Sequence, residues 1–341
     1  MGRAWMAALV GLALTVPTAI GTPVAAQDTQ VSCPTGVPAM NAHVASRFII
    51  DVIDNRDTSG IPELFAEDAV YHTSSRGDIE GVDAIKAMYD DMISGGRSRV
   101  SDPAITVDAI LANENHVAAA FTTTGIYDTA VDGTPASGEP VTYSRNIYAK
   151  MECGKIKDLW SLSDQFSRMG QYGQFAVSDV PEGLMQGADQ LPTNARANEC
   201  TIDDDNAVRE ALLSYYLDGF GDKNESRARL FLDENVLYHP VSGDDVIGPD
   251  AVMETFQRRI TSMPDLKVTV NDFFAADGFG ALRWTFTGTD TGGIYGNQPT
   301  NKTATWDGIM IVRLDCGKIT EMWSESDNLG SLRQLGLVPE N

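Results

Sequence analysis

The chain has 341 residues, with 25 Lys and Arg against 48 Asp and Glu, and its formal net charge is −23. This length is enough for two ordinary domains. A surface so negative repels phosphate backbones and anionic lipid, which excludes nucleic acid and membrane surfaces as expected partners. We interpret the charge as solubilising, in an extracytoplasmic or saline setting.

The first 26 residues have the pattern of a secretory signal peptide. Arg3 supplies a positive charge, residues 4–16 are almost wholly apolar, and residues 24–26 (VAA) are small, with the spacing that a signal peptidase accepts. An uncleaved anchor helix is the alternative, but spanning a bilayer needs roughly 20 apolar residues. We therefore expect cleavage near Gln27, and a secreted or periplasmic protein that has no membrane association after cleavage.

The following stretch has the pattern of helices and then strands. Residues 41–55 carry apolar side chains at helical spacing, and a second short helix is predicted over 61–66. A short strand then ends in Tyr71 and His72, and a third helix begins at Gly81. Longer strands complete this first domain, which we place at residues 33–166.

The same order of elements returns after a linker. Residues 167–199 contain scattered Gly, Pro and polar residues without a clear period, which is typical of a linker. The second domain is expected over 200–338, with helices over 206–221 and 226–232 and a third from Gly248. Its four predicted longer strands are residues 266–275, 280–289, 302–314 and 318–327. Helices followed by an antiparallel meander predict an α+β domain with helices on one sheet face.

A long internal repeat explains why the two halves read alike. Residues 153–164 (CGKIKDLWSLSD) and 316–327 (CGKITEMWSESD) are identical at eight of twelve positions. The similarity extends upstream, with an offset of 167 residues in the first half of each copy and 163 in the second. One change of offset, around residues 94–102, indicates duplication of a whole domain instead of a short solenoid repeat.

The four cysteines follow the duplication. Cys33 and Cys200 precede the first helix of each copy, and Cys153 and Cys316 lie in the last hairpin. Among the three possible pairings, only Cys33–Cys153 with Cys200–Cys316 gives both copies the same disulfide, and a secreted protein would keep it. Metal binding is the alternative, but no CxxC spacing is present and histidines are few, so neither a metal nor a cofactor is expected.

Three motifs together resemble the SnoaL-like domains of the nuclear-transport-factor-2-like superfamily, which also holds ketosteroid isomerases, limonene epoxide hydrolases and scytalone dehydratases. They are a Gly-x-Asp-Ala helix start, a strand ending in FTGTDTG, and the closing segment CGKITEMWSESDNLGSLRQLG (316–336). The resemblance covers both copies. It implies two tandem cones, each a strongly curved, mostly antiparallel sheet wrapped around helices, with an apolar pocket at one end. It also implies that the two open sheet faces pair as an intramolecular pseudo-dimer.

Candidate acid and base residues lie on the last strand and on the first short strand. Strict alternation puts Ile319, Glu321, Trp323, Glu325 and Asp327 on one face, which a cone would turn inward. Burial against an aromatic wall raises a carboxyl pKa and makes it useful for proton transfer near neutral pH. With the repeated histidines, the candidate catalytic residues are Asp327, His239, Glu321, Asp164 and His72. The candidate ligand-pocket residues are Trp323, Trp284, Tyr238, Trp306, Trp160 and Tyr71.

Structural roles are the alternative for each of these residues. Asp327 stands just before a predicted helix, where an aspartate commonly caps the N-terminus. Trp323 is more typical of a core position than of a ligand wall, and His239 precedes Pro240 at a turn. Arg283 and Arg145 have no counterpart in the opposite copy, so we expect each to form an ion pair particular to its own copy.

The resemblance also speaks against the aldol-cyclase mechanism. The acid/base Asp of the family's cyclases aligns with Ser324 and Ser161, and their accompanying His aligns near Met310 and Ile147. A serine hydroxyl holds its proton too tightly near neutral pH to replace a carboxylate.

Two functions therefore stay open. One is an extracytoplasmic enzyme that transfers protons on a small apolar carbonyl compound, in the manner of an isomerase, cyclase or hydratase. The other is a non-catalytic module that binds a small hydrophobic molecule or associates through its sheets. The state of Asp327 separates them, because a catalytic carboxylate must line a cavity and be free of helix N–H groups, whereas capping favours binding.

Overall fold

The computed structural model describes residues 37–73, 77–94, 100–128, 130, 135–172, 204–241 and 243–338. All of these residues belong to one compact unit, Cys33–Asn341. The expected signal peptide, Cys33, Cys200 and most of the expected linker lie outside the described residues. Among the residues that are described, no helix combines the length and the apolar character that crossing a membrane requires.

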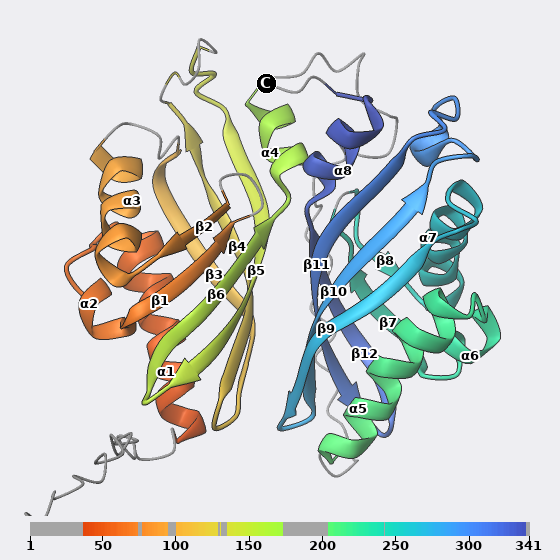
Figure 1. Ribbon diagram of the computed structural model, residues 1–341, viewed down its shortest axis with the longest axis horizontal. Helices are drawn as coiled ribbons and strands as arrows, with labels where there is room; N and C mark the ends of the chain where they lie inside the picture. The colour runs from red at the N-terminus through yellow and green to blue at the C-terminus, as the bar shows by residue number, and fades with distance from the viewer. Residues whose placement is uncertain are drawn as a thin grey trace, which may run out of the picture. The chain divides into compact units, whose positions relative to one another are not determined.

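The first copy begins with helices and continues into strands. Helix α1 runs without a break into a π-helical segment, η1, and the helices α2 and α3 flank the first two strands (Figure 1). The elements are α1 (Pro38–Arg47), η1 (Phe48–Asp54), α2 (Ile61–Leu64), β1 (Phe65–Thr73), β2 (Gly77–Glu80), α3 (Val82–Ser94), β3 (Val100–Ala112), β4 (His116–Tyr127), β5 (Pro140–Glu152), β6 (Lys155–Ser163) and α4 (Gln165–Gln171).

The second copy repeats this order and adds a short 3₁₀ segment, η4, before its third long strand. The elements are α5 (Asp205–Ser214), η3 (Tyr215–Gly221), α6 (Glu225–Arg229), β7 (Leu232–His239), β8 (Val246–Ile247), α7 (Pro249–Ser262), β9 (Lys267–Ala276), β10 (Phe279–Thr289), η4 (Ile294–Gly296), β11 (Thr303–Asp315), β12 (Lys318–Ser326) and α8 (Asn328–Leu335).

Each copy builds one six-stranded mixed sheet. The strand orders are β2-β1-β6-β5-β4-β3 and β8-β7-β12-β11-β10-β9, and only the pairs β1/β6 and β7/β12 are parallel. Helices α1 to α3 cover one face of the first sheet, and α5 to α7 cover one face of the second (Figure 1). The predicted α+β class and the tandem duplication are therefore confirmed.

The face under the helices holds the core of each copy. In the first copy Phe48 and Tyr89 pack edge to face, with ring centroids 5.9 Å apart. In the second copy the core is richer in aromatic rings, and Phe220 and Phe256 lie 4.4 Å apart. Because the helices bury this face, the other face of each sheet is the one left for contacts beyond the copy.

A helix lies across the expected end of the first domain. Helix α4 (Gln165–Gln171) crosses the expected boundary at residue 166 and docks on β5, where Gln171 exchanges two hydrogen bonds with the backbone of Thr142, each 2.8 Å long. Seven residues are too few to produce a recognisable helical period, which explains why this segment resembled a linker.

The hairpin between the last two strands of each copy needs two left-handed residues. Cys316 and Gly317 have φ values of 56° and 72°, and Cys153 and Gly154 have 53° and 71°. This pair of positive φ values is the signature of a type I′ turn, so the expected positive φ of Gly317 extends to the cysteine before it. Neither described cysteine is a free thiol. The pairing with Cys33 and Cys200 stays a prediction.

A β-bulge on the last strand overturns the expected alternation. Arg313 pairs with Glu321 and Leu314 pairs with Ile319, which leaves Thr320 without a partner in the ladder. Lys157 is the extra residue at the same place in the first copy. Because side chains alternate between the two faces of a sheet, one extra residue sends every later side chain on the strand to the face opposite the one that simple alternation predicts.

The consequence is that the side chains expected inside the second cone are divided between two faces. Ile319 and Met322 lie in the core under the helices, whereas Trp323 lies in a separate cluster on the opposite sheet face. The strict alternation that put Ile319, Glu321, Trp323 and Glu325 on one inward face was therefore wrong.

The sheet faces away from the helices contact each other. One apolar cluster combines Tyr148 and Leu162 of the first copy with Phe274, Ile309 and Trp323 of the second. Buried polar contacts accompany this cluster, so the two copies share a continuous interface through their sheets.

One carboxylate of the second copy anchors an ionic part of that interface. Asp272 lies 3.2 Å from Lys150 Nζ and 3.7 Å from His116 Nε2, both in the first copy. Although burial opposes it, these partners lower the pKa of Asp272, which holds the carboxylate in its charged form.

Candidate binding site between the two sheets

The predicted pocket residues are divided between three places. Tyr71 lies in the core of the first copy, and Tyr238, Trp284 and Trp306 lie in or against the core of the second. The other two, Trp160 and Trp323, belong to the cluster between the sheets. The bulge explains this division, since it sends the tryptophan of the last strand outward in both copies.

The two candidate aspartates cap helices. Asp327 Oδ1 accepts a hydrogen bond from the Gly330 N–H at 2.9 Å, and Asp164 Oδ1 accepts one from the Ser167 N–H at 2.9 Å. Burial raises the pKa of Asp164 to about 6 against the effect of this hydrogen bond, and burial likewise raises the pKa of Asp327. Because both carboxylates cap helices, their arrangement favours a binding function over a catalytic one.

His239 is enclosed by carboxylates. Its Nδ1 lies 2.8 Å from Asp245 and its Nε2 lies 3.3 Å from Glu321, and the ring stacks on Trp323 with 5.6 Å between centroids. Burial lowers the pKa of His239, but the hydrogen bonds to Asp245 and Glu321 outweigh it and raise the pKa to about 9. The imidazole is therefore protonated near neutral pH and has no lone pair with which to act as a base.

His72 has the equivalent surroundings in the first copy. Its Nδ1 lies 2.9 Å from Asp78 and its Nε2 lies 3.2 Å from Asp158. The ring stacks on Trp160 with 4.3 Å between centroids and an angle of 7° between the planes. Both histidines thus have both ring nitrogens engaged, and both lie against the tryptophan that faces the other copy.

The serines at the family's acid/base positions do lie inside the copies. Ser324 stands opposite Met310 and Ser161 stands opposite Ile147, in each case on the face that the helices cover. Both serines therefore point into their copies, as the acid/base residue of a cyclase would, but neither supplies a carboxylate.

The interiors of the two copies differ at two neighbouring positions, where a change in the size of one side chain is matched by a change in the other. Gly308 allows the Trp284 ring to lie against the strand, since a Cβ added at Gly308 would come within 2.0 Å of that ring. In the first copy Arg145 and Phe121 occupy these two positions, with the guanidinium carbon 5.9 Å from the ring centroid. The expected ion pair of Arg145 is absent among the described residues, because the side chain instead points into an aromatic interior.

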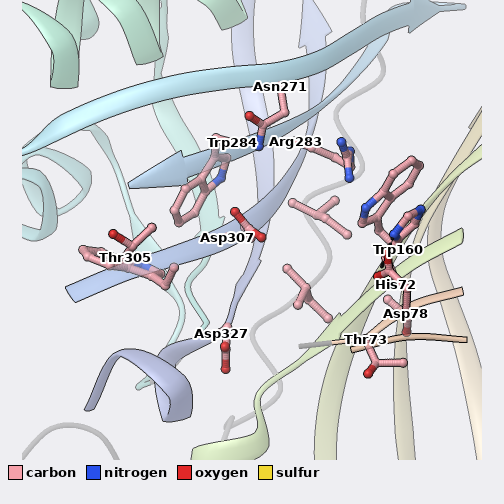
Figure 2. A pocket seen from close by; sticks show the side chains of 15 residues that line it. His72, Thr73, Asp78, Trp160, Asn271, Arg283, Trp284, Thr305, Asp307 and Asp327 are labelled. Carbon is pink, nitrogen blue, oxygen red and sulfur yellow. Dashed lines mark hydrogen bonds and ion pairs between the residues drawn. The ribbon is translucent and has the colours of Figure 1, made fainter. Parts of the chain in front are cut away.

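A cavity of about 300 Å³ lies between the sheets, and both copies contribute to its wall. Figure 2 shows Trp160, His72 and Asp78 on the side of the first copy and Arg283 and Asp307 on the side of the second. The lining residues are His72, Thr73, Asp78, Trp160, Ser161, Leu162, Asn271, Arg283, Trp284, Thr305, Trp306, Asp307, Gly308, Ile309 and Asp327.

Arg283 crosses from the second copy to the first. Its guanidinium carbon lies 3.4 Å from the centroid of the Trp160 ring and 5.7 Å from that of Tyr148. The expected ion pair of Arg283 is not present, because no carboxylate of the described residues lies within 4.0 Å of it. Burial lowers the pKa of Arg283, against the attraction of Asp272 and other acidic groups.

Two polar residues of the interface were missed by sequence reasoning. Asn146, 1% exposed, donates to backbone carbonyl oxygens of the other copy. Glu325, also 1% exposed, accepts a hydrogen bond from the Ser144 hydroxyl, and burial raises its pKa well above the ordinary range. Neither residue is repeated in the other copy, where Ile309 and Leu162 stand, and that difference was the available signal.

The described residues contain no group of three or more His, Cys, Asp or Glu side chains arranged to hold a metal ion. Two carboxylates approach each of His72 and His239, but their oxygens are used in ion pairs with the imidazole rings. The site is thus built from aromatic rings, one guanidinium and carboxylates that already have partners.

Comparison with known families gives a match to the SnoaL-like polyketide cyclase model over residues 43–172 and again over 210–335. Comparison with curated proteins gives no match.

Among solved structures, AclR from Streptomyces galilaeus is 21% identical, with 40% of this chain and 86% of that chain covered and a TM-score of 0.37. TsrD from Streptomyces laurentii is 22% identical over 40% of this chain and 99% of that chain, with a TM-score of 0.37. A protein with a ketosteroid isomerase-like fold from Catenulispora acidiphila is 14% identical over 38% and 94%, with a TM-score of 0.33.

Proposed function

The chain belongs to the SnoaL-like polyketide cyclase family in both of its copies, and from this premise we propose that it binds a small hydrophobic molecule without proton-transfer chemistry. The observation that carries the proposal is the cavity of about 300 Å³ between the sheets. Apolar residues from both copies, Trp160 and Leu162 of the first and Ile309 of the second, form part of its wall. Apolar walls with a few polar groups are typical of small-molecule sites.

The state of the acid and base candidates supports binding over catalysis. Asp327 and Asp164 accept helix N–H groups, and His239 is held as a cation between two carboxylates. The inward positions that would carry a carboxylate in a cyclase hold Ser324 and Ser161. Each group expected to move a proton therefore has a structural partner or has been replaced.

The cavity requires both copies, so the proposed binding unit is the intramolecular pair. Leu162 of the first copy and Ile309 of the second meet in one apolar cluster beside it. Either copy alone would have only half of the wall. We also propose that the protein works outside the cytoplasm, on the strength of the signal-peptide pattern in the first 26 residues.

A cavity-filling pair of variants tests the binding site. Asn271 lines the cavity, and its duplicated counterpart Asp108 is equally exposed but does not line it. We expect isothermal titration calorimetry to detect binding of 2-naphthamide, a neutral two-ring probe, to the wild type and to Asp108→Trp, and loss of binding in Asn271→Trp. Absence of binding to the wild type, or equal binding to both variants, would contradict the proposal.

A further inference from the structure

We infer that the cavity selects a small molecule with a single carboxylate, and that Arg283 binds this carboxylate. The inference rests on the proposed function, because it names the chemical class of the ligand for the same cavity. It adds a recognition residue and a charge requirement that the apolar wall alone does not give.

The first argument is that Arg283 has no polar partner in the described part of the chain. It forms no hydrogen bond or ion pair there, and its Nε is buried without a partner. A guanidinium offers five N–H donors in a planar fork that matches a carboxylate with two parallel hydrogen bonds. Its guanidinium lies over the rings of Trp160 and Tyr148, and such contacts leave the N–H donors in the guanidinium plane unused.

The second argument comes from the carboxylates around the cavity, which already have partners. Asp78 lies 2.9 Å from His72, Asp327 accepts the Gly330 N–H at 2.9 Å, and Asp307 accepts the hydroxyl of Thr285 at 2.5 Å. These groups therefore do not compete for Arg283 at hydrogen-bonding distance.

Their negative charge nevertheless limits what the cavity accepts. Asp78, Asp307 and Asp327 repel a second negative charge on a ligand, and the protein as a whole carries −23. A phosphate monoester carries about two negative charges at neutral pH. A ligand with one negative charge meets Arg283 at a lower electrostatic cost, which favours a carboxylate over a phosphate.

The third argument is that Arg283 is held in a fixed position. Trp160 stacks on His72, with 7° between the planes, and the Arg283 guanidinium carbon lies 3.4 Å from the centroid of the same ring. The guanidinium is therefore oriented before a ligand arrives, which lowers the cost of binding a carboxylate.

The residues proposed to bind the carboxylate are not repeated at the equivalent positions of the other copy. Arg283 corresponds to Ala120, and Asp307 corresponds to Ser144, in the first copy. Leu162, which lines the cavity, corresponds to Glu325. At the equivalent place, Ala120 and the buried carboxyl group of Glu325 stand where Arg283 and Leu162 stand here, so the cation is particular to one of the two places.

The experiment compares four ligand and protein combinations by calorimetry on the whole mature chain. The probes are 2-naphthoate and its neutral isostere 2-naphthamide, and the proteins are the wild type and Arg283→Gln. We expect the wild type to bind 2-naphthoate about tenfold more tightly than 2-naphthamide, and Arg283→Gln to lose that preference while it keeps its affinity for 2-naphthamide. The dianion 2-naphthyl phosphate should bind the wild type more weakly than 2-naphthoate.

Lys150→Gln is the matched control, because Lys150 also lies near Trp160, at 5.9 Å, but is paired with Asp272 and does not line the cavity. It should keep the preference for 2-naphthoate. Equal affinity of the wild type for 2-naphthoate and 2-naphthamide would overturn the inference and leave the proposed function standing, whereas failure to bind either probe would overturn both. The wild-type comparison remains decisive if Arg283→Gln does not fold.

Discussion

The side-chain amide of Asn146, on β5 of the first copy, donates to the carbonyl oxygens of Ile309 and Trp323 in the second, at 3.2 and 3.1 Å. One side chain thus joins two neighbouring strands of the opposite sheet. A buried amide whose two donors are both used in this way fixes how the two sheets sit against each other, since any sliding would leave the donors without partners. The cavity beside it depends on that fixed position, because its wall comes from both sheets.

We expect Asn146→Ala to lower the free energy of unfolding by about 1–3 kcal/mol, because it removes two buried hydrogen bonds across the interface. Urea denaturation followed by tryptophan fluorescence measures this. The exposed Asn235→Ala serves as the control and should change stability by less than about 0.5 kcal/mol. An unchanged stability of Asn146→Ala would show that the sheets are held by the apolar cluster alone.

Glu325 should make the protein less stable as the pH rises. Burial raises its pKa in the folded state, so its contribution is fully present below the unfolded value of about 4.3 and is lost as the pH rises through the folded value. Glu325→Gln keeps an acceptor for Ser144 but cannot ionise. We therefore expect the variant to gain stability over the wild type as the pH is raised from 4 to 8.

The measurement for Glu325 is the free energy of unfolding in urea at several pH values, with the exposed Glu234→Gln as the control. A constant difference between Glu325→Gln and the wild type across this range would contradict the buried, uncharged state of the carboxyl group.

His239 should titrate with a midpoint of about 9 in an NMR pH series of its ring carbons. Since the folded pKa lies above the unfolded value of about 6.5, the stabilisation is complete below pH 6.5 and is lost as the pH rises through about 9. Glu321→Gln removes one of its two carboxylate partners and should lower the midpoint by about one pH unit. A midpoint near 6.5 in the wild type would show that the ring is free to act as a base.

Asp327 should behave as a helix cap when it is replaced. Asp327→Ala is expected to cost about 1 kcal/mol in the free energy of unfolding, because the Gly330 N–H loses its acceptor. Asp327→Ser keeps an acceptor oxygen at the same place and should recover most of that loss. If serine were as destabilising as alanine in urea denaturation, the carboxylate itself, and not its capping role, would be what the fold needs.

The order of elements could be predicted from the sequence because it depends on local patterns. Helical spacing, the Cys-Gly turn and the repeated closing segment each lie within a few residues, and the duplication allowed each copy to confirm the other. The capping role of Asp327 was also available locally, from its position before Asn328 and Leu329.

The bulge could not be predicted, because it is set by the pairing of two strands. The extra residues, Thr320 and Lys157, differ between the copies and carry no common local signal. Without the bulge, alternation sends Trp323 and Trp160 into the cones instead of between the sheets. One unrecognised residue in the ladder thus changed the expected location of the site.

The role of Arg283 was hidden for a similar reason. Its partner, Trp160, lies 123 positions earlier in the chain and in the other copy, so only the docking of the two sheets brings them together. The sequence does show that Ala120 stands at the equivalent position, but such a difference alone predicts an ion pair within the copy as readily as a contact with the other copy. Contacts between the two copies are made by residues on the outer sheet faces. The sequence pattern within one copy does not indicate which residues of the other copy these side chains contact.

The most direct test of the central claim, that one cavity shared by both copies binds the ligand, is photo-crosslinking with a diazirine derivative of 2-naphthamide followed by peptide mass spectrometry. Labels should appear both on β6, in residues 155–163, and on β11, in residues 303–309, and should disappear when excess 2-naphthamide competes. Labels confined to the interior of one copy, such as η3 at Tyr215–Gly221, would contradict the account.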